Sequence, residues 1–96
     1  LRQVKFDRGS LPAAYRMRGT YEWLKSRPGT AKKWWQKSLD ISEGMAARYE
    51  SGLTNLEMGK FMEDPVYLRR AEEIFAEIGA KFDRAQAQKF LERITQ

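Results

Sequence analysis

Apolar residues recur at helical spacing along most of this 96-residue chain. Between residues 68 and 78 they fall at i, i+3, i+6, i+7 and i+10, which a helix brings onto one face. No segment keeps a period of two for more than four residues, so we expect no sheet and predict an all-α fold. The three clearest stripes are Ala31, Trp34, Trp35 and Leu39; Leu68, Ala71, Ile74, Phe75 and Ile78; and Ala87, Phe90, Leu91 and Ile94.

Residues that start and stop helices divide the chain into about five helices. Asp64 is a suitable N-cap, and Pro65 after it stands in a first turn, where its missing N–H costs no hydrogen bond. Gly44 and Gly79 stand where a left-handed residue commonly ends a helix. Asp83, with a glutamine three residues later, is typical of a capping box. The predicted helices span about residues 11–27, 31–43, 45–62, 65–78 and 84–95.

An internal repeat appears when the chain is shifted by 40 residues. The shift places Gly19 on Gly59, Ala31 on Ala71 and Trp35 on Phe75. In each copy, we expect the glycine and the alanine to face each other where two helices cross, because both allow a close approach. The aromatic residue then fills the space one turn further on.

Glycine, alanine at +12 and an aromatic at +16 resemble the tetratricopeptide repeat. The runs Leu56–Lys60 and Ala71–Ala80 resemble the C-terminal repeat arrays of large bacterial signalling proteins, among them ATPase-containing transcription regulators and adenylate cyclases. The resemblance implies one domain, residues 1–96, of antiparallel helical hairpins stacked in a right-handed array. A HEAT-like array stays open, since the period of 40 exceeds the family's about 34. Repeat one would cover about residues 10–44, repeat two about 45–80, and a capping helix about 83–96.

The resemblance also implies a binding groove for a protein or peptide. In this family, groove-facing residues lie three before, one after and four after the glycine of the first helix of each repeat. Aromatic and arginine side chains in such a groove are of the types enriched at binding hot spots. The positions selected in this way are Arg16, Thr20, Trp23, Leu56, Lys60 and Glu63.

An open end of the array is a second candidate surface. Leu11, Tyr15 and Trp23 would form an apolar edge on the first helix, and such patches are poorly tolerated in water. A second copy of the chain, meeting the same edge across a two-fold axis, is therefore a further candidate partner. Burial of Trp23 against a preceding repeat is the alternative.

The net charge of +5 is unevenly distributed. Residues 1–38 contain ten Lys/Arg and two acids, a net +8, whereas residues 39–96 contain eight and eleven, a net −3. Cations interleaved with aromatic residues are typical of single-stranded nucleic-acid binding, which is our alternative function. Aromatic residues at helical spacing more often pack in a core, so we rank protein binding first. The residues concerned are Tyr15, Arg16, Arg18, Tyr21, Trp23, Lys25, Arg27, Lys32, Lys33, Trp34, Trp35 and Lys37.

The sequence offers little for catalysis. It has no cysteine and no histidine, which removes thiolate nucleophiles, zinc sites of Cys or His type and the commonest general base. Its glycines are isolated and form no phosphate-binding loop. We therefore expect no enzyme activity, no cofactor and no metal. We see no membrane span or signal peptide and no initiator Met, and we expect a cytoplasmic fragment of a larger protein.

Overall fold

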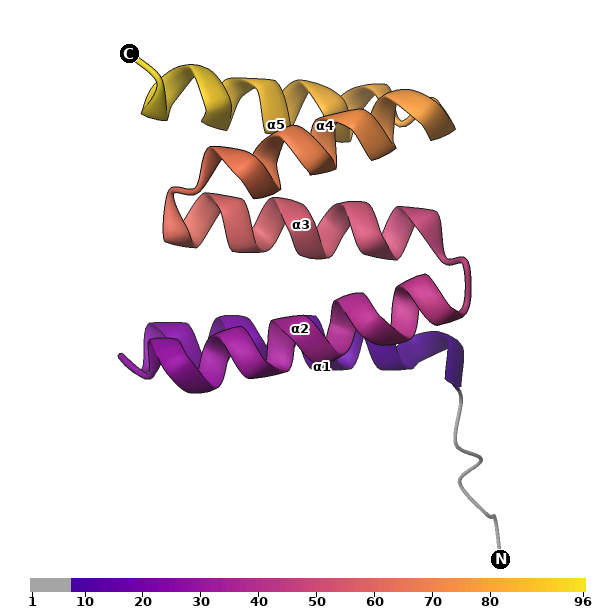
Figure 1. Cartoon of the computed structure of the whole chain (residues 1–96), viewed down its shortest axis with the longest axis vertical. Coiled ribbons are helices and arrows are strands. Elements are labelled where there is room, and N and C mark those ends of the chain that lie inside the picture. The colour runs from indigo at the N-terminus through magenta and orange to yellow at the C-terminus, as the bar shows by residue number, and fades with distance from the viewer. Residues whose placement is uncertain (1–7) are drawn as a thin grey trace, which may run out of the picture.

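The computed structural model describes residues 8–96, which form five α-helices and a short 3₁₀ turn at Arg8–Ser10 (Figure 1). No strand occurs within these residues, so the predicted all-α fold is confirmed. The helices are α1 (Leu11–Leu24), α2 (Pro28–Gly44), α3 (Arg48–Met62), α4 (Pro65–Ile78) and α5 (Lys81–Ile94).

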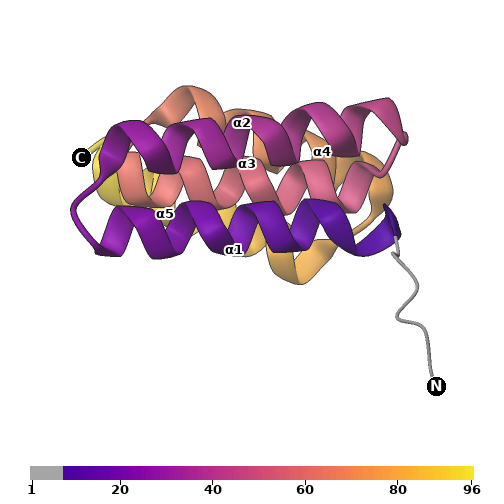
Figure 2. The ribbon, with the colours of Figure 1, turned by 90° about the horizontal axis from the view of Figure 1, so that it is seen from below.

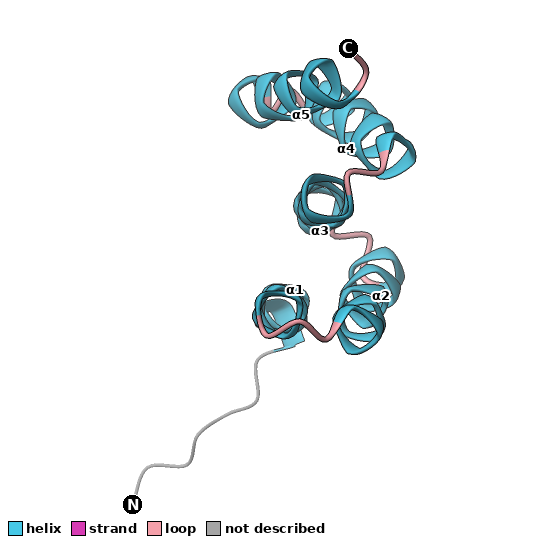
Figure 3. Cartoon of the chain, turned by 90° about the vertical axis from the view of Figure 1, so that its left-hand side faces the viewer, coloured by secondary structure: helices cyan, strands magenta, loops and turns pink. Residues whose placement is uncertain are grey.

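The helices are arranged in two layers. Seen end-on in Figure 3, α1, α3 and α5 lie on one side, and α2 and α4 lie on the other. Consecutive helices run in opposite directions (Figure 1). α1 packs mainly on α2, and α4 packs on both α3 and α5. Viewed from below, α1, α2 and α3 extend side by side along the molecule (Figure 2). The first layer therefore places residues of α1 and α3 next to each other.

Two of the predicted helix boundaries follow the expected chemistry. The Asp64 carboxylate accepts a hydrogen bond of 3.0 Å from the backbone N–H of Val66 and so caps α4. Gly79 ends the same helix in the left-handed conformation, with φ of 75°. Glycine adopts this conformation without the steric cost that a Cβ atom brings.

Four other boundaries differ from the prediction. α1 ends at Leu24 rather than at about residue 27. α2 begins at Pro28 rather than at residue 31, because proline is well suited to the first helical position. Gly44 is still helical, and Ala46 supplies the left-handed residue, with φ of 55°, which delays α3 to Arg48. α5 begins at Lys81, so Asp83 lies in its first turn and forms no capping box.

The structural repeat is shorter than the shift of 40 residues read from the sequence. α1 and α3, like α2 and α4, begin 37 residues apart, so the sequence alignment is out of register by about one turn. A Cβ atom on Gly59 would lie 2.5 Å from the Leu68 side chain, so Leu68 is its nearest neighbour, and the expectation that Gly59 faces Ala71 stays a prediction. All six repeat residues are nevertheless buried: Gly19, Ala31, Trp35, Gly59, Ala71 and Phe75.

Buried apolar residues form two core clusters. Ala31, Trp35, Leu39 and Met58 join α2 to α3, and Phe61 and Trp23 pack against them. Ala71, Phe75 and Ala87 join α4 to α5, with Leu53 and Leu56 of α3 packed alongside. Each of the helices α1–α5 thus contributes to at least one cluster, and α3 and α4 contribute to both, since Tyr67 of α4 packs against the first.

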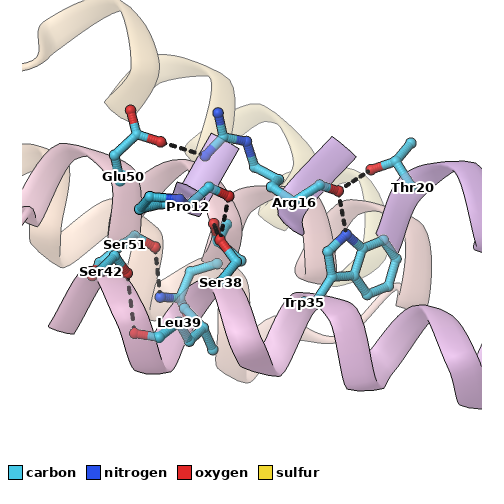
Figure 4. Close-up of polar contacts among 11 residues, drawn as sticks. Pro12, Arg16, Thr20, Trp35, Ser38, Leu39, Ser42, Glu50 and Ser51 are labelled. Atoms are coloured by element: carbon cyan, nitrogen blue, oxygen red, sulfur yellow. Dashed lines mark hydrogen bonds and ion pairs between the residues drawn. The ribbon is translucent and has the colours of Figure 1, made fainter. Parts of the chain in front are cut away.

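A seam of small polar side chains joins the first hairpin to the second. The Ser38 hydroxyl donates to the carbonyl oxygen of Pro12 at 2.7 Å (Figure 4). It also lies 2.8 Å from the Thr54 hydroxyl. Ser42 and Ser51 form a second hydroxyl pair at 2.9 Å. Because no buried side-chain nitrogen or oxygen within residues 8–96 lacks a partner, this seam carries no desolvation penalty from unpaired groups.

We predict that Gly19→Ala destabilises the protein by about 1–3 kcal/mol through overpacking. The new methyl group would lie 2.3 Å from the ring of Trp35, which is fully buried and has no room to move. Urea unfolding monitored by circular dichroism measures the change. The matched control is Gly29→Ala in the first turn of α2, where the new group would meet nothing within 4 Å beyond its chain neighbours and the backbone of its own helix, and stability should not fall.

Candidate interaction surfaces

Three of the six predicted groove residues form polar contacts between α1 and α3 or along α3. The Arg16 guanidinium pairs with the Glu50 carboxylate at 2.7 Å. The Thr20 hydroxyl donates to Glu57 at 2.7 Å, and the Lys60 ammonium lies 3.1 Å from the same carboxylate. These contacts hold the first layer together, and whether the three side chains also contact a partner stays a prediction.

The other three groove candidates are in different surroundings. The ring of Trp23 is half-buried, with its centroid 5.7 Å from that of Trp35 and 6.4 Å from that of Phe61. Leu56 packs against the second core cluster, and Glu63 is exposed at the left-handed turn that ends α3. Trp23 thus belongs with the core residues and adds little to the apolar edge expected on the first helix.

Glu22 is a buried acid that the sequence reasoning did not single out. Its side chain is only 3% exposed and accepts hydrogen bonds from Arg18 at 2.9 Å and Arg27 at 3.0 Å. The hydrogen bond from Arg27, helped by Arg18, holds the pKa of the Glu22 carboxyl below its usual value, although burial opposes this. Arg18 and Arg27, two of the cations in the basic half of the chain, are therefore paired with a buried acid of the protein itself. A sequence signal existed, since Glu22 is one of only two acids among residues 1–38.

A second group of aromatic and basic side chains lies on the outside of α1 and α2. The rings of Tyr15 and Trp34 are 5.6 Å apart. The Lys37 ammonium lies 4.9 Å from the Trp34 ring centroid, and the Arg18 guanidinium lies 5.3 Å from it. The cations thus already cover the aromatic ring that the nucleic-acid alternative requires for base stacking.

An exposed apolar stripe follows the side of α1 that faces away from its buried residues. Its members fall at i, i+3, i+7 and i+10, and we call Ala14, Met17, Tyr21 and Leu24 the α1 stripe. The three large side chains are 69%, 50% and 68% exposed, respectively. Sequence reasoning missed this stripe because it assigned helical apolar spacing to the core, although the spacing itself could be read directly.

The remaining exposed apolar side chains do not form such a stripe. Within residues 8–96 the large ones outside α1 are Tyr49, Val66, Ile78 and Phe82, distributed over α3, α4 and α5. On the terminal helix α5, Phe82 stands among exposed residues that are mostly charged or polar. The two ends of the helical stack therefore differ, since the apolar stripe lies on α1 and a largely polar face lies on α5.

The described residues offer little ligand chemistry. No cluster of three acidic side chains within residues 8–96 could hold a metal ion. A shallow hollow of about 330 Å³ is lined by Tyr15, Lys37, Asp40 and Ile41. None of the helices α1–α5 combines the length and the apolar character that crossing a membrane requires.

Comparison with protein-family models, with curated proteins and with solved structures gives no match.

We predict that Glu22 makes stability depend on pH in the acid range. Its pKa is lower in the folded state than in the unfolded chain, so its stabilising effect is fully present above about pH 4.5. That effect is lost as the pH falls through the folded-state pKa. Glu22→Gln should therefore be less stable than the wild type at pH 7, and the difference should shrink on acidification. Thermal melts between pH 7 and pH 3 measure this, with the exposed Glu92→Gln as the control.

Proposed function

We propose that this chain is a cytoplasmic, non-catalytic protein-interaction module and that the α1 stripe is its principal binding surface. The observation that carries the proposal is the exposure of three large apolar side chains, Met17, Tyr21 and Leu24, along one helix. Contiguous apolar surface that is not required by the core is typical of sites where another protein binds.

The α1 stripe belongs to a helix that is held firmly in place. The indole N–H of Trp35 donates to the carbonyl oxygen of Arg16 at 3.1 Å, which fixes α1 on α2. The ion pair of Arg16 with Glu50 and the hydrogen bond of Thr20 to Glu57 fix α1 on α3. A surface ordered before binding loses less conformational entropy when the partner arrives, which favours affinity.

We further propose that the module is a tetratricopeptide-like array from a bacterial signalling or regulatory protein. The resemblance of the glycine, alanine and aromatic positions supports this. So does the spacing of the helix starts: α1 to α3 is 37 residues and α3 to α5 is 33, near the family's about 34. In such arrays each hairpin packs on its neighbours, and the function is recognition rather than catalysis.

We predict that helical peptides selected by display against the 96-residue chain bind at the α1 stripe. Met17→Glu should weaken the binding of such peptides by about tenfold or more, because the charge must be desolvated at an apolar contact. Val66→Glu is the matched control, since Val66 is 66% exposed on α4 and should not contribute. If the selected peptides bind both variants equally well, the α1 stripe is not the binding surface.

Nucleic-acid binding remains the alternative, favoured by the aromatic and basic group around Trp34. We predict that a labelled single-stranded oligonucleotide shows no sub-micromolar binding at physiological salt. The reason is that Arg18 and Arg27 are engaged with Glu22, and the Trp34 ring packs on Tyr15. Fluorescence anisotropy measures it, and weak binding of the same oligonucleotide at low salt serves as the positive control. Tight binding at physiological salt would reverse our ranking.

A further inference from the structure

We propose that the partner bound by the α1 stripe is an amphipathic α-helix of another protein, with acidic residues beside its apolar seam. This inference rests on the proposed function and adds the chemical class of the ligand. It follows from the spacing of the stripe and from the charges next to it.

The spacing of the α1 stripe matches the seam of a coiled coil. In heptad notation Ala14 and Tyr21 occupy a positions, and Met17 and Leu24 occupy d positions. The eleven residues from the first to the last member extend about 15 Å along one side of α1. A helix with its own a and d residues fits such a seam by knobs-into-holes packing. Sheet-edge pairing is not available on α1, since its backbone hydrogen bonds are used within the helix.

The charges beside the stripe select an acidic partner. Arg18 directly follows Met17 and occupies an e position, where salt bridges set partner choice in paired helices. Lys25 directly follows Leu24 and is the C-cap residue at the end of α1. Arg18 already pairs with Glu22, whereas Lys25 forms no ion pair within residues 8–96. The Lys25 ammonium lies 5.6 Å from the Tyr21 ring, next to the stripe itself. A carboxylate on the partner helix would therefore meet a cation without an acidic partner.

A second copy of the chain does not supply that carboxylate. If two α1 helices packed in antiparallel fashion, Arg18 and Lys25 of one copy would oppose the same two residues of the other. Like charges opposed across an interface disfavour that partner. The acid of α1 itself, Glu22, is buried and paired with two arginines, so it does not offset this repulsion. The charge pattern therefore favours a different, acidic chain over an antiparallel pair of α1 helices.

The test uses two designed helical peptides, about three heptads long, that share one apolar seam. One carries Glu at the flanking positions and the other carries Lys. Isothermal titration against the 96-residue chain should show the Glu peptide binding at least about tenfold more tightly, with the preference reduced at high salt. Met17→Glu should abolish binding of the Glu peptide, and Val66→Glu should leave it unchanged.

A charge exchange makes the test independent of folding defects. Lys25→Glu should shift the preference toward the Lys peptide, because the variant side chain then attracts the opposite charge. Lys89→Glu on the exposed surface of α5 is the matched control and should leave the preference as in the wild type. Rescue of one variant by one peptide cannot arise from a general loss of structure.

Several results would overturn this inference. Equal binding of the two peptides would show that charge does not select the partner, and absence of binding would show that no acidic helix docks there. A dimer in sedimentation that Met17→Glu dissociates would identify a second copy as the occupant. Tighter binding of anionic vesicles than of the Glu peptide would identify a lipid surface. If display selection yields peptides that need Lys60 rather than Met17, the α1 stripe is not the binding surface and this inference fails with it, while the proposed protein-interaction role stands.

Discussion

The contact between Gly19 and Trp35 determines how α1 lies in the molecule. The indole occupies the space where a larger residue would place its Cβ atom, so α1 and α2 approach closely. The same ring donates its N–H to the Arg16 carbonyl and stacks on Phe61, with centroids 6.2 Å apart. One buried side chain thus links α1, α2 and α3, and the position of the exposed stripe on α1 depends on it.

The joint between the two hairpins combines apolar and polar contacts. The first core cluster joins α2 to α3, and α2 also meets α3 through the hydroxyl pairs of Ser38 with Thr54 and Ser42 with Ser51. Small side chains permit a close approach, and their hydrogen bonds require matching positions on both helices. The hydroxyl pairs therefore specify the register of the second hairpin on the first, in addition to the apolar contact at Met58 and Phe61.

Local chemistry predicted the helices well, and contacts between distant residues account for what it missed. The Asp64 cap and the Gly79 terminus depend on neighbouring residues alone, so both could be read from the sequence. The register between the repeats could not be read from the sequence, because a shift of one helical turn keeps Ala31 and Ala71 on equivalent faces. Glu22 pairs with Arg27 across the turn that ends α1, but its burial arises only from the packing of α1 in the fold. The α1 stripe was visible as a pattern, but only burial distinguishes a second apolar face from a core face.

The unequal ends of the helical stack have a consequence for stoichiometry. An assembly can grow without limit only when each added subunit presents a new copy of the surface that received it. Here α1 offers the apolar seam, while α5 at the opposite end presents mostly charged and polar side chains. On our proposal that the α1 stripe binds a partner, residues 8–96 therefore have one binding end, which predicts a complex of fixed composition and no growth into a filament.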